Sequence, residues 1–298
     1  GGGPAVAVPE TLRSHGGIWL GWDGRTVADG HPAPITANAY ENITIATMSL
    51  SEKDYQDYYH SFSNSVLWPV FHNRLDLATI NSEAVGGYRR VNQSFARALA
   101  ALVRPDDLIW VHDYHLIPLA AELRQMGCQN RIGFYLHIPF PAPDVFAAAP
   151  EHEWLMQSLM SYDLVGFQTE ADVGNFKRSL GELETKVNRE KGAKDWPAFS
   201  GTAAAFPIGI DVDAFAAMAN TEEANARIRQ LNRHASARVH IIGVDRLDYT
   251  NGLPARLRSF RRLLELFPEN QTVATPMQIA PCPLYPSDPP ADLTRRHH

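Results

Sequence analysis

The chain has 298 residues, enough for one large domain or two ordinary ones, and its 45% hydrophobic content is typical of a soluble globular protein. The 27 Lys and Arg against 33 Asp and Glu give a net charge of −6, so neither a nucleic-acid partner nor an anionic membrane is expected. We see no signal peptide, no apolar run of the roughly 18 residues that would span a bilayer, and only two cysteines. A cytoplasmic location is expected, and a homo-oligomer is left open.

From residue 107 onward, short β-rich runs alternate with helical segments, which predicts a parallel sheet with helices on both faces. Strands are expected at Asp107–His112, Arg131–His137, Asp163–Gln168, Ala204–Ile208 and Val239–Val244, the last buried on both faces. Helices are expected at Leu116–Met126, Glu151–Met160, Glu170–Leu180, Glu222–Ala235 and from Gly252, where Leu257, Phe260, Leu264 and Phe267 share one face. A loop is expected around Glu190–Gly201 and a turn at Gly86-Gly87.

The change in pattern near residue 235 predicts a boundary between a first domain, 1–235, and the start of a second, 236–281. Six prolines lie between Pro276 and Pro290, a density that excludes a helix or a central strand. Residues 282–298 are therefore expected to form a disordered tail.

Three predicted strands end in polar groups, where open parallel sheets bind their ligands: His112-Asp113-Tyr114-His115, His137, and Asp245-Arg246. An aromatic and polar cluster, 58–68, has the residue types that hold sugars. At the strand ends, His112, His115 and His137 could form a metal site, but the further carboxylate or cysteine of such a site is missing and no metal is expected. A strand-end histidine is also more often structural than catalytic.

Arg246 follows a strand and precedes a Gly-Pro helix start, an arrangement suited to a pyrophosphate. GxSxG, Walker and GxGxxG motifs are absent from the sequence, so hydrolase, phosphate-loop and dinucleotide functions find no support.

Several strings together resemble the trehalose-6-phosphate synthase family, glycosyltransferase family 20, over roughly residues 1–281. They are YYHSFSNSVLWPVFHNRLDL, VNQSFARAL, DDLIWVHDYHLIPLAAELR, RIGFYLHIPFPAPDVF, YDLVGFQTEAD, FPIGID and GVDRLDYTNGLPARLRSF. The resemblance implies an α/β fold of the GT-B type, with a Rossmann-like parallel-sheet domain and an incomplete second one. It also implies transfer of glucose from UDP-glucose to glucose 6-phosphate, with retention, giving trehalose 6-phosphate and UDP without cofactor or metal.

The resemblance assigns residues to each substrate. Acceptor-binding residues would be Trp22, Tyr59, Trp68 and Asp113. Donor-binding residues would be Gly2, Gly3, His137, Arg246 and Asn251. His137 and Asp113 would be the catalytic pair, acting by positioning and charge stabilisation because attack on the leaving-group face needs no enzyme nucleophile.

The family pattern is broken in three places. Its first strand, with an Asn-Arg pair for the sugar phosphate, would precede Gly1; Asn251 replaces a lysine; and the match stops after Pro281, as after a shifted reading frame. We therefore expect a fragment truncated at both ends, a poor transferase that Asn251→Lys alone does not restore, and one prone to associate through Val239–Val244. A relative using another acceptor, such as glycerol 3-phosphate, and a non-catalytic sugar-phosphate-binding remnant remain alternatives.

Overall fold

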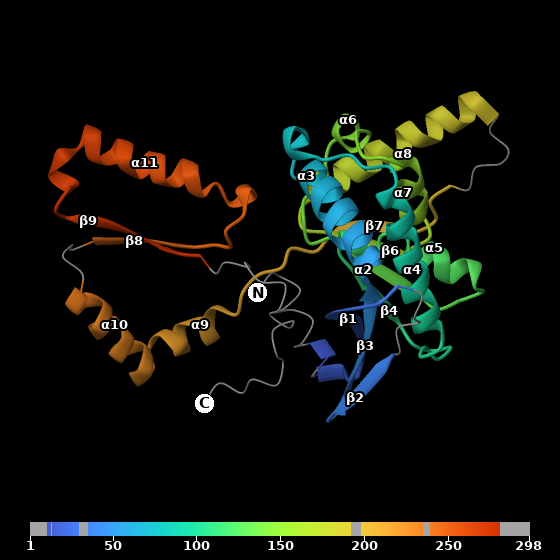
Figure 1. Cartoon of the computed structure of the whole chain (residues 1–298), viewed down its shortest axis with the longest axis horizontal. Helices are drawn as coiled ribbons and strands as arrows, with labels where there is room; N and C mark the ends of the chain where they lie inside the picture. The colour runs from blue at the N-terminus through green and yellow to red at the C-terminus, as the bar shows by residue number, and fades with distance from the viewer. Residues whose placement is uncertain (1–10, 13, 30–34, 192–197, 235–238, 281–298) are drawn as a thin grey trace. The chain divides into compact units, whose positions relative to one another are not determined.

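The computed structural model describes residues 11–12, 14–29, 35–191, 198–234 and 239–280 (Figure 1). The chain divides into two compact units, Gly1–Ile208 and Gly209–His298, so the expected boundary at residue 235 falls inside the second of them. Gly2, Gly3 and the predicted tail lie outside the described residues, as do residues 192–197 of the predicted loop.

A parallel sheet organises the first unit. Its strands β4 (Ile109–His112), β5 (Ile132–Tyr135), β6 (Leu164–Phe167) and β7 (Thr202–Ala205) lie in that order, and every neighbouring pair is parallel. These are four of the predicted strands, each confirmed within a few residues.

Helices connect the strands of this sheet, as predicted. They are η3 (Tyr114–Leu116) and α5 (Leu119–Gln125) before β5, α6 (Pro143–Phe146) and α7 (His152–Leu159) before β6, and α8 (Glu170–Lys191) before β7. Helix α8 continues past Leu180, where the prediction ended it, because Leu183 and Val187 extend its buried apolar face. Its last two residues therefore occupy the start of the segment predicted as a loop.

A second sheet, which the sequence did not predict, precedes the first. Strand β3 (Ile43–Ser51) lies between β1 (Gly17–Val27), to which it is parallel, and β2 (Thr36–Tyr40), to which it is antiparallel. Ala46, Met48 and Leu50 are buried at every second position of β3, the periodicity of a strand with one face on a core.

Five helical segments follow β3 in the sequence and precede β4. They are α2 (Glu52–Asp54), the π-helix η1 (Tyr55–Leu67), α3 (Trp68–Phe71), η2 (Leu75–Leu77) and α4 (Ala84–Ala100). The prediction of a turn at Gly86-Gly87 is wrong, because both residues lie inside α4. A β-carbon on Gly87 would lie 2.1 Å from Cβ of Asp57, so a glycine is required where α4 meets η1.

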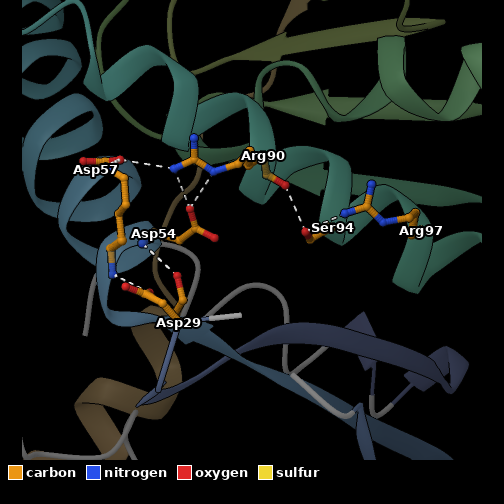
Figure 2. Close-up of polar contacts among 8 residues, drawn as sticks. Asp29, Asp54, Asp57, Arg90, Ser94 and Arg97 are labelled. Atoms are coloured by element: carbon orange, nitrogen blue, oxygen red, sulfur yellow. Dashed lines mark hydrogen bonds and ion pairs between the residues drawn. The ribbon is translucent and has the colours of Figure 1, made fainter. Parts of the chain in front are cut away.

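Ion pairs at the surface join α4 to the end of α2 and the start of η1 (Figure 2). The Arg90 guanidinium donates to Asp54 at 2.9 Å and to Asp57 at 3.2 Å, and Lys53 reaches Asp57 at 2.7 Å. Exposed pairs contribute little free energy singly, and these three share Arg90 and Asp57 between them. They link α4 to the start of η1, the helix that carries Tyr59.

The second unit contains α9 (Val212–Ala219), α10 (Glu222–His234), β8 (Val239–Val244), η4 (Tyr249–Asn251), α11 (Leu253–Leu266), η5 (Pro268–Asn270) and β9 (Ala274–Ile279). Strands β8 and β9 pair in parallel. Strand β8 has the predicted bounds, but its predicted burial is wrong: Ile242 is 62% exposed and Val244 65%. Within the described residues β9 is its one paired neighbour, which leaves these side chains uncovered.

Two further details of this unit bear on the prediction. Pro276 lies in the stretch expected to exclude a helix or a central strand, and it belongs to β9, which among the described residues is paired on one side and so tolerates a residue without an N–H. Helix α11 ends at Leu266, so Phe267 does not extend its face, and Leu257 is exposed rather than packed. Among the helices described, none is both long and apolar enough to cross a bilayer.

Candidate active site

Asp113 occupies a strained turn at the carboxyl end of β4. Its φ of 69° lies in the left-handed region that residues with a β-carbon avoid. Its N–H donates to the carbonyl of Tyr135 at 2.8 Å, and its Oδ1 accepts from the backbone N–H groups of Tyr114 (3.1 Å) and His137 (3.3 Å). The carboxylate thus joins the ends of β4 and β5, where a parallel sheet places its ligand.

Burial raises the pKa of the Asp113 carboxyl to about 6, against the opposing effect of its two backbone hydrogen bonds. The group is therefore mostly ionised at neutral pH but within about one pH unit of protonation. A carboxylate in this state accepts hydrogen bonds from sugar hydroxyls and can also take up a proton.

Buried side chains hold the loop that follows Asp113. The carbonyls of the four residues 114–117 accept, in order, from the Tyr88 hydroxyl (2.5 Å), from Asn92 Nδ2 (3.2 Å), and from the Tyr162 hydroxyl at 3.0 and 3.1 Å. Tyr88, Asn92 and Tyr162 are themselves almost fully buried. A loop whose carbonyls are satisfied internally is rigid, so Asp113 stands on a preorganised support.

An aromatic cluster adjoins this turn. Tyr59 of η1 stacks on His115 with ring centroids 5.5 Å apart, and lies 5.5 Å from Trp22 of β1. Tyr114 lies 4.0 Å from the His115 ring and 5.8 Å from Trp68. The three aromatic residues predicted to bind an acceptor are therefore connected through Tyr114 and His115. These two residues directly follow Asp113 in the sequence.

Polar contacts fix this aromatic cluster to η1. The Tyr114 hydroxyl donates to Asn64 Oδ1 at 2.8 Å. Burial lowers the pKa of His115 to about 4, so its ring is neutral at physiological pH and stacks on Tyr59 without a charge. The result is a set of partly buried ring faces beside one carboxylate, the combination that binds a sugar.

His137 lies two residues beyond β5 and hydrogen-bonds to the last residue of β4. The distance from His112 Nδ1 to His137 Nε2 is 3.0 Å, and the two rings are inclined by 28°. Burial lowers the pKa of each ring to about 4, and each is neutral at physiological pH. In the described part of the chain, no group of three or more His, Cys, Asp or Glu residues is arranged to hold a metal ion.

The loop after His137 is held by the start of α8. Asp172, which is buried, accepts from the N–H of Phe140 at 2.9 Å, and Asn175 Nδ2 donates to the Phe140 carbonyl at 2.7 Å. Thr169 donates to the other carboxylate oxygen at 2.6 Å. The main chain is therefore held before His137 by the sheet and after His137 by the start of α8.

Arg246 and Asn251 belong to the second unit, in the turn between β8 and α11. The Asn251 side chain donates to the Arg246 carbonyl at 2.8 Å, and Asp248 Oδ1 accepts from Thr250 N–H at 2.8 Å. Gly252, with φ of 65°, then leads into α11. The Asn251 amide therefore serves the turn itself, and Arg246 is exposed at its surface.

Comparison with solved structures defines the class of the fold. A Burkholderia xenovorans α,α-trehalose-phosphate synthase (UDP-forming) in complex with glucose 6-phosphate matches with a TM-score of 0.85 and 42% identity, covering 95% of this chain and 63% of that one. An E. coli protein bound with UDP-2-fluoro glucose matches with a TM-score of 0.82 and 38% identity, covering 95% and 62%. These neighbours confirm the expected α/β fold of the GT-B type.

The sequence comparisons agree with the structures. The model of glycosyltransferase family 20 matches residues 2–286, and the chain belongs to this family. The trehalose-6-phosphate synthase of Sinorhizobium fredii is 45% identical over 283 residues, and that of an Enterobacter species 43% over 281. The matched regions cover 94% of this chain but 61% and 58% of those proteins, so the chain spans about three fifths of their length.

Proposed function

We propose that the chain transfers glucose from UDP-glucose to glucose 6-phosphate, giving trehalose 6-phosphate and UDP, the activity of an α,α-trehalose-phosphate synthase (UDP-forming). The observation that carries the proposal is the partly buried carboxylate of Asp113, held at a strained turn beside the aromatic cluster. The Burkholderia xenovorans relative, which shares this fold, was solved with glucose 6-phosphate.

On the acceptor side, the apolar ring faces of Trp22, Tyr59 and Trp68 would pack against the sugar. Asp113 would accept a hydrogen bond from an acceptor hydroxyl, orienting that oxygen for attack on the donor sugar. Orientation of this kind contributes to rate by converting a bimolecular encounter into a positioned one. The ionised state of Asp113 at neutral pH supports this role.

On the donor side, His137 would hydrogen-bond to the transferred glucose and Arg246 would bind the diphosphate through its permanent positive charge. Asn251 would contribute no charge there, since an amide is neutral. Gly2 and Gly3 complete the proposed donor residues. The E. coli relative bound with UDP-2-fluoro glucose supports a nucleotide-sugar donor.

The proposal includes no cofactor, no metal and no nucleic-acid partner, and it places the reaction in the cytoplasm. Self-association is a separate expectation, which the exposed strand β8 supports.

The test is release of UDP from UDP-glucose by the purified chain, with glucose 6-phosphate or glycerol 3-phosphate as acceptor. We expect release that depends on glucose 6-phosphate, at a rate below the roughly 10 per second of a typical enzyme because Asn251 brings no charge to the diphosphate. Release that depends instead on glycerol 3-phosphate would assign another acceptor. Binding of glucose 6-phosphate without turnover would assign a sugar-phosphate-binding protein.

A further inference from the structure

We infer that His112 is a positioning residue, which holds the His137 ring in one orientation and one tautomer through the hydrogen bond between its Nδ1 and Nε2 of His137. The inference rests on the proposed function only for the identity of the ligand, a donor sugar hydroxyl, that His137 would meet.

The main chain around both histidines is fixed. His112 pairs with Tyr135 in the sheet register, and the N–H of Leu136 donates to the Gly166 carbonyl at 3.0 Å. The His137 N–H donates to Asp113 Oδ1 at 3.3 Å. With the backbone held, the remaining freedom of His137 is the rotation of its ring, and the bond to His112 fixes that rotation.

The bond between the rings also couples their protons. A neutral imidazole carries one N–H, at Nδ1 or at Nε2. If His112 donates from Nδ1, His137 must accept at Nε2 and carry its own proton at Nδ1. If His137 donates from Nε2, His112 must carry its proton at Nε2. The two rings therefore hold the same tautomer, whichever it is.

The free end of this pair is Nδ1 of His137. This atom is buried and has no hydrogen-bond partner among the described residues. Buried polar atoms without a partner are rare in folded proteins, and a ligand hydroxyl would supply one. Whether Nδ1 offers a proton or a lone pair to that hydroxyl depends on the tautomer, and so on His112.

Both rings are neutral at physiological pH, because burial lowers the pKa of each to about 4. The choice between two neutral tautomers is therefore the state that His112 controls. The indole of Trp110 lies 4.4 Å from the His112 ring, and Tyr135 lies 4.7 Å from the His137 ring, so both rings are also confined by neighbours.

The experiment is NMR of the ¹⁵N-labelled full chain, read through the ring nitrogens of His112 and His137. We expect both residues to show the same single tautomer. In His112→Phe, which keeps a ring but removes the bond, the separation between the two ring-nitrogen shifts of His137 should fall as both tautomers are populated. His112→Asn, whose amide can either donate or accept at this position, should keep the His137 ring in place without selecting one tautomer.

The controls are His60→Phe, an exposed histidine of η1, and the His115 signals, which report an intact aromatic cluster in every variant. Opposite tautomers in the wild type, or an unchanged His137 spectrum in His112→Phe, would overturn the inference. The spectra need no ligand. A separate titration with UDP-glucose that showed no binding would contradict the proposed function, while the tautomers would still decide the role of His112.

Discussion

The two units of the chain differ in how their strands end. In the first, β4 leads to Asp113 and β5 to His137. Buried Tyr88, Asn92 and Tyr162 hold the loop after Asp113, and buried Asp172 holds the loop after His137. In the second, the side chains of β8 itself are exposed, and Leu253 is the one buried hydrophobic residue among those described. A well-packed core allows strained, partly desolvated polar groups to persist, because the free energy gained by burial elsewhere in the fold offsets the cost of the strain.

The largest expected contrast is in the cost of deleting a phenyl group. Phe134 of β5 is 2% exposed, so Phe134→Ala should lower the free energy of unfolding by about 3–5 kcal/mol. Phe267, which is 49% exposed, is the matched control, and Phe267→Ala should change stability by no more than about 0.5 kcal/mol. Denaturant unfolding measures both. Equal losses would show that the second unit has a core of comparable strength.

The next contrast is the pH dependence of stability. The pKa of His115 is about 4 in the folded chain against 6.5 unfolded, so the unfolded state binds more protons between these values and stability is lost as pH falls through this window. The loss is on the order of 2–3 kcal/mol for His115 alone. His115→Phe, which keeps a ring against Tyr59, should flatten the curve measured by unfolding at pH 4 to 7.

Asp113 acts in the opposite direction. Its pKa is about 6 when folded against 3.8 as the ordinary value, so its contribution falls as pH rises through that range. Asp113→Asn should therefore steepen the acid-side loss that His115 causes. A His115→Phe variant with the pH profile of the wild type would contradict the burial of that ring.

A smaller effect is expected from one hydroxyl of the supporting network. Tyr88→Phe removes the donor to the Tyr114 carbonyl and should cost about 1–2 kcal/mol of stability, since a buried carbonyl is left unpaired. Tyr40→Phe, at an exposed tyrosine of β2, is the control and should have almost no effect. If the two variants proved equally stable, the loop would not depend on this network.

The smallest expected effect concerns association through β8. Ile242→Lys places a charge on the exposed strand and should weaken self-association by about tenfold, or 1.4 kcal/mol, in sedimentation experiments. Ile80→Lys, at an exposed isoleucine of the first unit, tests whether any added charge does the same. Identical behaviour of both variants would remove β8 as the contact surface.

The sequence predicted the parallel strands because each is a short apolar run between breakers. It missed the sheet of β1, β3 and β2, although Ala46, Met48 and Leu50 alternate as a half-buried strand requires. It predicted the bounds of β8 correctly but not the exposure of its side chains, since an apolar run does not determine which elements pack against it. Candidate residues at strand ends were predictable from the topology, whereas the aromatic cluster joins β1, η1 and the end of β4 through contacts that no local pattern contains.

The supporting side chains could not be predicted either. Tyr88, Asn92 and Tyr162 reach the loop across 23 to 46 residues of sequence, and each is an ordinary residue of its own segment. The bond between His112 and His137 was closer to prediction, because both lie at the ends of strands that the βαβ pattern makes neighbours.

The most direct test of the account is calorimetric titration of glucose 6-phosphate into the chain, with Asp113→Asn and the exposed Asp106→Asn as matched variants. We predict that the wild type and Asp106→Asn bind alike and that Asp113→Asn binds at least about tenfold more weakly, a loss of about 1.4 kcal/mol from one charge-assisted hydrogen bond. Unchanged affinity in Asp113→Asn, with the wild type binding, would contradict the assignment of the acceptor site to the end of β4.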